Sequence, residues 1–296
     1  MAYGGSITDR IGNTPIVEAR HIFSSNGVRL FFKLEGNNPG GSVKDRAAFN
    51  MINEAVKRGD IEKGGHLVEA TSGNTGIALA FIAQFFGLNM VLIMPENSTV
   101  ERVKTMRAYG AEVILTPKED GIEGSRDLAF KLRDEKGYVL LNQFENENNW
   151  KAHYKTTGRE IWRDTEGDVT HFVSAMGTTG TVMGVSTFLK EKNENIKIIG
   201  AQPADGASIP GIRKWSPDYV PKFFDRSKVD QVVEVTEEEA KTMTKRLALE
   251  EGIFAGMSSG GAVHCALKIA ESIDEGVVVV VICDRGDRYL SSPLFE

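Results

Sequence analysis

The stretch Asn38-Pro39-Gly40-Gly41-Ser42-Val43-Lys44-Asp45-Arg46 places one lysine directly behind a glycine turn and at the start of a helical pattern. The two glycines force a tight turn, and Ser42 is expected to cap the helix that follows. A lysine at this position can be desolvated beside helix amides, which favours the neutral amine that forms an imine with a carbonyl group. Taken alone, Lys44 would be a solvated surface residue, but this setting makes it a candidate nucleophile.

Outward from this stretch, short β-rich runs alternate with helical patterns along the whole chain. Residues 277–282 are all apolar, which is typical of a central parallel strand buried on both faces. The alternation predicts an α/β fold with open, mostly parallel twisted sheets flanked by helices. We expect strands at residues 29–34, 66–70, 89–94, 112–115, 171–175, 197–202, 231–235 and 277–282. We expect helices at residues 45–58, 75–86, 99–109, 124–135, 150–163, 179–192, 236–251 and 259–273.

Three further loops are rich in Gly, Ser and Thr and also lead into predicted helices. They are Thr71-Ser72-Gly73-Asn74-Thr75-Gly76, Gly177-Thr178-Thr179-Gly180-Thr181 and Met257-Ser258-Ser259-Gly260-Gly261. In open α/β sheets ligands bind beyond the carboxyl ends of the strands, where loop amides and hydroxyls can hold an anion. One such loop is usually only a turn, but three of them together with Lys44 predict a phosphate-bearing carbonyl cofactor.

Nucleotide cofactors are a poorer fit to these loops. The dinucleotide fingerprint G-x-G-x-x-G after a first strand is absent, and so is the Walker pattern G-x-x-x-x-G-K-[ST]. Nicotinamide and nucleoside-triphosphate chemistry are therefore disfavoured.

Composition and charge exclude other classes. With 296 residues, 41% apolar and 26% charged, the chain is expected to form one large or two medium globular domains. A net charge of -6 and a pI near 5.6 argue against binding of nucleic acid or an anionic membrane. There is no run of about 18 apolar residues that could span a bilayer, and the N-terminus lacks the pattern of a secretion signal.

The two cysteines, Cys265 and Cys283, are predicted to be buried free thiols of a protein in a reducing compartment, which favours the cytoplasm. The five histidines are scattered without the spacing of metal ligands, so no metal site is expected.

Several motifs of the sequence resemble those of a known family. The sequence is similar to the fold-type-II pyridoxal-phosphate enzymes, and specifically to cysteine synthases (O-acetylserine sulfhydrylases), over essentially its whole length. The motifs that carry the resemblance are Ile11-Gly-Asn-Thr-Pro15, Lys33-Leu-Glu-Gly-Asn-Asn-Pro39, Ser42-Val-Lys-Asp-Arg46, Glu69-Ala-Thr-Ser-Gly-Asn-Thr-Gly76 and Cys283-Asp-Arg-Gly-Asp-Arg-Tyr-Leu-Ser291. The last motif, with Ile209-Pro-Gly-Ile-Arg213, is more similar to isozyme B than to isozyme A.

The resemblance implies a role for each motif. Lys44 should hold pyridoxal 5'-phosphate as an imine and then act as the general base on the substrate Cα. Asn74 should hydrogen-bond the cofactor's ring hydroxyl, Ser258 should face its pyridine nitrogen, and Asp284 should help form the wall nearby. The phosphate should be cradled by Gly177, Thr178, Thr179, Gly180 and Thr181. The substrate carboxylate should be held by Thr71, Ser72, Gly73, Thr75 and Gln143.

The implied reaction is the replacement of the acetoxy group of O-acetyl-L-serine by sulfide, which gives L-cysteine. A neutral serine at the pyridine nitrogen draws less charge into the ring than an aspartate would, which favours β-elimination. The resemblance also implies a homodimer with two domains per chain. Residues 1–37 and 147–296 would form the larger, cofactor-binding domain, and residues 38–146 a smaller, mobile substrate-binding domain.

Isozyme B is associated with thiosulfate as a second sulfur donor and with an Arg-Arg-Trp run. The corresponding run here is Arg213-Lys214-Trp215, in which lysine keeps the charge but loses the planar fork of arginine. Thiosulfate use with Arg213 in the site is therefore a hypothesis. The alternatives are an O-phosphoserine sulfhydrylase, a cystathionine β-synthase-like enzyme, a serine/threonine dehydratase, or a non-catalytic binding partner, which the intact Lys44 argues against.

Overall fold

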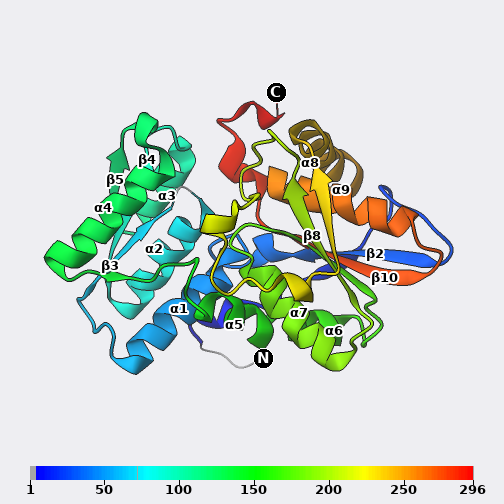
Figure 1. Cartoon of the computed structure of the whole chain (residues 1–296), viewed down its shortest axis with the longest axis horizontal. Helices are drawn as coiled ribbons and strands as arrows, with labels where there is room; N and C mark the ends of the chain where they lie inside the picture. The colour runs from blue at the N-terminus through cyan, green and yellow to red at the C-terminus, as the bar shows by residue number, and fades with distance from the viewer. Residues whose placement is uncertain (1–4, 72, 296) are drawn as a thin grey trace.

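The computed structural model describes residues 5–71 and 73–295 and contains two open sheets with helices packed around them (Figure 1). The larger sheet has the strand order β1-β2-β10-β7-β8-β9. Its members are β1 (Ile16–Glu18), β2 (Val28–Leu34), β7 (His171–Ala175), β8 (Lys197–Pro203), β9 (Gln231–Val235) and β10 (Gly276–Ile282). Only β1 and β2 pair antiparallel in this sheet, so the predicted mostly parallel α/β architecture is confirmed.

The smaller sheet is parallel throughout and has the order β5-β4-β3-β6. Its members are β3 (His66–Ala70), β4 (Asn89–Pro95), β5 (Glu112–Thr116) and β6 (Val139–Leu140). The strand β10 of the larger sheet is buried from residue 278 to 282 on both faces, as its apolar run predicted.

Helices lie on both sheets and between them (Figure 1). They are α1 (Lys44–Arg58), α2 (Asn74–Phe86), α3 (Val100–Ala108), α4 (Gly121–Lys136), α5 (Asn148–Lys155), α6 (Thr157–Asp164), α7 (Gly180–Lys192), α8 (Glu237–Glu251) and α9 (Met257–Glu271). The helix α8 begins after Thr236, whose hydroxyl accepts the Glu239 backbone N–H while the Glu239 carboxylate accepts the Thr236 N–H, so a capping box opens it.

Three local predictions need correction. The helix expected at 150–163 is two helices, because Thr156 leaves helical geometry (φ -128°, ψ -78°) while its hydroxyl bonds the Ala152 carbonyl. The strands β1 and β6 were not predicted, since runs of three and two residues carry no periodicity. Val43, rather than Ser42, is the N-cap of α1, although the Ser42 hydroxyl does accept the Lys44 N–H at 3.2 Å.

A buried ion network connects the start of α1 with β2 and α6. Arg46 donates two hydrogen bonds to Glu35 at 2.7 Å each and two to Glu160 at 2.6 and 2.8 Å. Lys33 lies 2.9 Å from the same Glu160 carboxylate and 3.0 Å from Asp164. Because buried charges are tolerated only when they are paired, this network fixes the position of the helix that begins with Lys44.

Within residues 5–71 and 73–295, no helix is long and apolar enough to cross a membrane. The same residues contain no group of three or more His, Cys, Asp and Glu side chains that could hold a metal ion.

Candidate active site

Lys44 is the first residue of α1 and lies against the end of β10. The Val43 N–H donates to the Cys283 carbonyl at 2.8 Å, and Ser42 forms an isolated bridge with Asp284. Burial lowers the pKa of the half-buried Lys44 amine, although the neighbouring Cys283 and Asp284 oppose this. Within the described residues its Nζ has no hydrogen bond or ion pair. The site therefore presents an unpaired amine that is easier to deprotonate than an ordinary lysine.

The glycine turn before Lys44 is held by two buried side chains. Asp45 accepts the Gly40 N–H, and Arg288 donates to the Gly40 carbonyl. Gly41 adopts φ +80°, a left-handed conformation that favours glycine. Burial raises the pKa of the Asp45 carboxyl to about 7. These contacts confirm the predicted tight turn and show how it is anchored to the C-terminal part of the chain.

Asn74, the first residue of α2, lies between two charged side chains. Its amide nitrogen donates to Asp284 at 2.6 Å, and its oxygen accepts from Arg288 at 2.7 Å. Asp284 also accepts the Gly256 N–H at 3.1 Å, just before α9. The starts of α1, α2 and α9, where Lys44, Asn74 and Ser258 lie, are thus joined through the segment that follows β10. The segment 257–261, predicted as a loop, is the beginning of α9.

The 177–181 loop joins β7 to α7 and has the features of an anion cradle. Thr179 has φ +67°, and its buried hydroxyl lacks a hydrogen-bond partner in the described part of the chain. Thr178 accepts the Gly180 N–H at 3.3 Å, and Thr181 lies 3.4 Å from the His153 ring. Burial lowers the pKa of His153 to about 3, so this imidazole brings no positive charge to the loop. An anion would be held by amides and hydroxyls at the start of α7.

The 71–76 loop is tied to the 177–181 loop through Gln143. Thr75 donates to the Gln143 side-chain oxygen at 2.9 Å. Asn149 at the start of α5 donates to the Gln143 carbonyl at 2.7 Å and to the Thr178 hydroxyl at 3.2 Å. The predicted substrate loop and the predicted phosphate loop therefore share one hydrogen-bonded path, although they belong to different sheets. Ser72, also predicted to hold substrate, lies outside the described residues.

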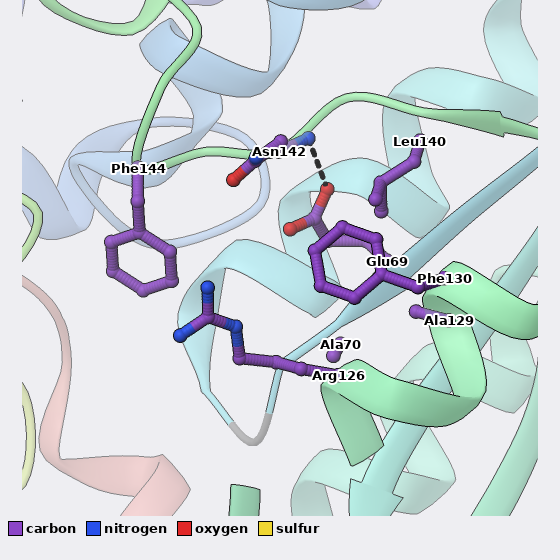
Figure 2. A pocket seen from close by; sticks show the side chains of 8 residues that line it. All are labelled: Glu69, Ala70, Arg126, Ala129, Phe130, Leu140, Asn142 and Phe144. Atoms are coloured by element: carbon purple, nitrogen blue, oxygen red, sulfur yellow. Dashed lines mark hydrogen bonds between the residues drawn. The ribbon is translucent and has the colours of Figure 1, made fainter. Parts of the chain in front are cut away.

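The Glu69 carboxylate accepts a hydrogen bond from the Gln143 backbone N–H, in a small pocket formed by β3, α4 and the 140–144 segment. Figure 2 shows this carboxylate turned toward Asn142, whose N–H it accepts at 2.9 Å. Burial raises the pKa of Glu69 to about 7, although the N–H groups of Gln143 and Asn142 and the charge of Arg126 oppose this. Asn142 has φ +51°, so the contact holds an uncommon backbone conformation immediately before Gln143.

Ser258 and Arg213 lie near the beginning of the 177–181 loop. A Cβ atom on Gly211 would come within 3.1 Å of Ser258, and one on Gly177 within 2.8 Å of the Gly211 carbonyl. Ser258 also hydrogen-bonds the Cys283 thiol, whose pKa burial raises to about 12. The Arg213 N–H donates to the Met176 carbonyl at 2.8 Å, and its guanidinium lies 5.5 Å from the Trp215 ring centroid.

The structure thus brings together the predicted residues that it describes. Ser42 and Val43, just before Lys44, contact Asp284 and Cys283, and Ser258 contacts Cys283. Asn74 and Gly256 both donate to Asp284, and Thr75 is joined to Thr178 through Gln143 and Asn149. The sequence did not predict a role in the site for Glu69, Asn149, Cys283 or Arg288. Glu69, Cys283 and Arg288 stand in the motifs quoted above, but no pattern in the sequence shows what they contact. Both cysteines are free thiols as predicted, although Cys283 is only half-buried.

These residues fit pyridoxal phosphate. The unpaired Lys44 amine suits a covalent bond to its aldehyde carbon. The orphaned Thr179 hydroxyl, in a strained backbone at a helix start, suits its phosphate. Asn74 is half-buried and faces Asp284 and Arg288 with only part of its hydrogen-bonding capacity used.

Comparison with known proteins identifies the family. A model of the family described as "Pyridoxal-phosphate dependent enzyme" matches residues 7–284. Cysteine synthase B of Pseudomonas aeruginosa is 55% identical over 98% of this chain and 97% of its own, and that of Escherichia coli K12 is 54% identical over 98% and 96%. The crystal structure of cysteine synthase from Entamoeba histolytica is 38% identical and has a TM-score of 0.93 over 99% of this chain and 91% of its own. The chain therefore belongs to the pyridoxal-phosphate-dependent enzymes, within their cysteine synthase group.

Proposed function

We propose that this chain makes L-cysteine by replacing the acetoxy group of O-acetyl-L-serine with sulfide, with pyridoxal phosphate bound to Lys44. The observation that carries the proposal is the unpaired Lys44 amine with its lowered pKa, next to Asp284, which joins the starts of α2 and α9. When bound, the cofactor withdraws electrons from the substrate Cα and so weakens the Cα–H bond.

Lys44 serves as the proton carrier in this proposal. Its amine takes the Cα proton as the acetoxy group leaves Cβ, and it returns the proton to Cα after sulfide has added to Cβ. A lysine of ordinary pKa would be protonated at neutral pH and unable to accept this proton. The burial that lowers the pKa of Lys44 therefore supports the role.

The substrate carboxylate is assigned to the 71–76 loop and Gln143. Thr71 and Thr75 are buried beside the start of α2, where backbone N–H groups lack partners within the helix. Gln143 has its oxygen engaged by Thr75, which leaves its amide N–H groups as donors for a carboxylate. Glu69 and Asn149 hold the backbone of Gln143 in place.

The direct test is product formation by the purified protein loaded with pyridoxal phosphate. L-Cysteine should form from O-acetyl-L-serine and sulfide, and much more slowly from O-phospho-L-serine. Faster turnover of O-phospho-L-serine would transfer the assignment to an O-phosphoserine sulfhydrylase. If the protein binds no pyridoxal phosphate, the proposed enzymatic function is wrong.

The phosphate cradle yields the first mutational prediction. Thr179→Val keeps the branched shape but removes the orphaned hydroxyl, so cofactor affinity should fall about 10- to 100-fold, as expected for a lost hydrogen bond to a charged group. Equilibrium titration of the apoprotein with pyridoxal phosphate measures this. Thr187→Val on the same helix is the control, because that hydroxyl bonds the Met183 carbonyl instead. Equal affinities for all three proteins would remove Thr179 from the phosphate site.

We further propose that the site accepts thiosulfate and that Arg213 binds this anion. Lys214 is already paired with Asp205 at 2.6 Å and with Glu234 at 2.7 Å. Arg213 has its guanidinium near the Trp215 ring instead, and the Trp215 indole donates to the Gly177 carbonyl at 2.8 Å. Of the two neighbouring cations, Arg213 is thus the one placed beside the 177–181 loop and available to a sulfur donor.

Arg213→Ala should lower kcat/KM for thiosulfate about 10-fold or more and leave that for sulfide within about 2-fold, since the larger oxyanion needs the charge-assisted hydrogen bonds. Lys214→Ala, in which the removed charge was already paired, should leave both values near those of the wild type. Steady-state kinetics with each donor measure the ratio. Equal losses with sulfide and thiosulfate would show that Arg213 does not select the donor.

Four properties stay predictions. They are the division into a domain of residues 1–37 and 147–296 and a domain of residues 38–146, the mobility of the smaller domain, the homodimer and the cytoplasmic location. Light scattering of the purified protein tests the dimer. Small-angle scattering with and without substrate tests closure of the smaller domain, which would keep water from the reacting substrate.

A further inference from the structure

The side-chain amide of Asn74 is held at both ends by groups of opposite charge. Its Nδ2 lies 2.6 Å from Asp284 Oδ2, and its Oδ1 lies 2.7 Å from Arg288 Nη1. Asp284 is 1% exposed and Arg288 is 9% exposed, so water competes little for either contact. Asn74 itself is half-buried, at the edge of the site.

These neighbours leave the amide one orientation. An ionised carboxylate only accepts hydrogen bonds, so the group facing Asp284 must be the NH2 end. A guanidinium only donates, so the group facing Arg288 must be the oxygen. A flipped amide would place donor against donor and acceptor against acceptor. After both contacts, one N–H of Nδ2 is left without a partner among the described residues.

We propose that Asp284 and Arg288 are positioning residues that lock Asn74 as a hydrogen-bond donor to the ring oxygen of the cofactor. This inference rests on the proposed function and on the role that the family resemblance implies for Asn74, a hydrogen bond to that oxygen. A fixed donor favours the deprotonated ring oxygen over the hydroxyl, because a deprotonated oxygen accepts the hydrogen bond more strongly. Asp284 and Arg288 thus set the electronic state of the cofactor through Asn74.

Further contacts show that both residues are themselves firmly placed. Asp284 also accepts from the Tyr289 hydroxyl at 2.5 Å and from the Gly256 N–H, and Arg288 also donates to the Gly40 carbonyl. The pair therefore spans the turn before Lys44, the start of α2 and the loop before α9. Because these contacts hold Asp284 and Arg288 in place within the protein, the orientation of the Asn74 amide does not depend on the cofactor being bound.

Asp284→Asn tests the inference with little change of shape. An amide at this position no longer demands the NH2 end of Asn74, so only Arg288 still favours one orientation and the lock is weakened. Pyridoxal phosphate should bind roughly 3- to 10-fold more weakly. Part of the absorption of the bound cofactor should also move from its visible band to its near-ultraviolet band, because the ring oxygen keeps its proton more often. Affinity and spectrum identical to those of the wild type would overturn the inference.

A double-mutant cycle separates positioning from other roles of Asp284. In an Asn74→Ala background, Asp284→Asn should change the spectrum no further, since the group that it positions is gone. A full additional shift in that background would mean that Asp284 acts on the cofactor without Asn74, and would overturn the inference. If Asp284→Asn does not fold, Arg288→Gln replaces it, with the same expected shift and the same contradicting result. A wild-type protein that binds no cofactor would instead refute the proposed function.

Discussion

Lys44→Ala should abolish covalent attachment of pyridoxal phosphate and lower kcat at least about 1,000-fold. The substitution removes both the nucleophile that holds the cofactor and the base that carries the Cα proton. Loss of a positioned general base alone costs about 100- to 10,000-fold. Two measurements check this: the visible absorption of the purified protein, and its mass after borohydride reduction, which fixes an attached cofactor irreversibly.

Two variants show whether the effect belongs to the amine itself. Lys44→Arg keeps the positive charge, but a guanidinium stays protonated and can neither attack the aldehyde nor take a proton. It should therefore be as inactive as Lys44→Ala. Lys57→Ala, on the same helix with a side chain that is 61% exposed, should behave like the wild type. A Lys44→Ala protein that keeps its visible band and a tenth of its activity would contradict the assignment.

The parts of the site that the sequence predicts are those that local chemistry determines. Consecutive residues determine the backbone conformation of the Gly40-Gly41 turn before Lys44 and of the 177–181 loop before α7. Both can therefore be recognised in the sequence without knowledge of the fold. The sheets follow from periodicity for the same reason. Where periodicity is short, as in Val139–Leu140, only pairing with β3 makes the strand.

The connections between these parts depend on residues that are far apart in the chain. Asn74 and Arg288 are separated by 214 positions, and Asn149 and Thr178 lie in different segments that meet only in the folded protein. Asn and Arg are usually exposed at the protein surface, so no local pattern in the sequence shows that one of them will be buried beside a charged side chain. Lys33 and Glu160 are the extreme case, because both are buried charged residues.

Arg46→Ala should destabilise the protein by about 3–5 kcal/mol at neutral pH, the usual cost of leaving buried charges without their partner. Arg46 is 2% exposed and binds Glu35 and Glu160, which are 0% and 5% exposed. Its removal leaves Lys33 as the cation nearest to Glu160 and leaves Glu35 with the Thr14 hydroxyl and the Asn38 amide. Denaturant unfolding of the apoprotein measures the loss without interference from the cofactor.

The pH dependence distinguishes this electrostatic cause from lost packing. The hydrogen bonds and charge of Arg46, with Lys33, hold the folded-state pKa of Glu160 at about 2 although burial opposes them, against 4.5 for the free side chain. The stabilisation from Glu160 is therefore complete above pH 4.5 and is lost as the pH falls toward 2. In Arg46→Ala the buried carboxyls can become neutral in acid, so the difference from the wild type should shrink as the pH falls below 4.5. A deficit that is constant with pH would indicate packing instead. Arg58→Ala at the other end of α1, which breaks an exposed pair with Asp60, should cost less than about 1 kcal/mol at every pH.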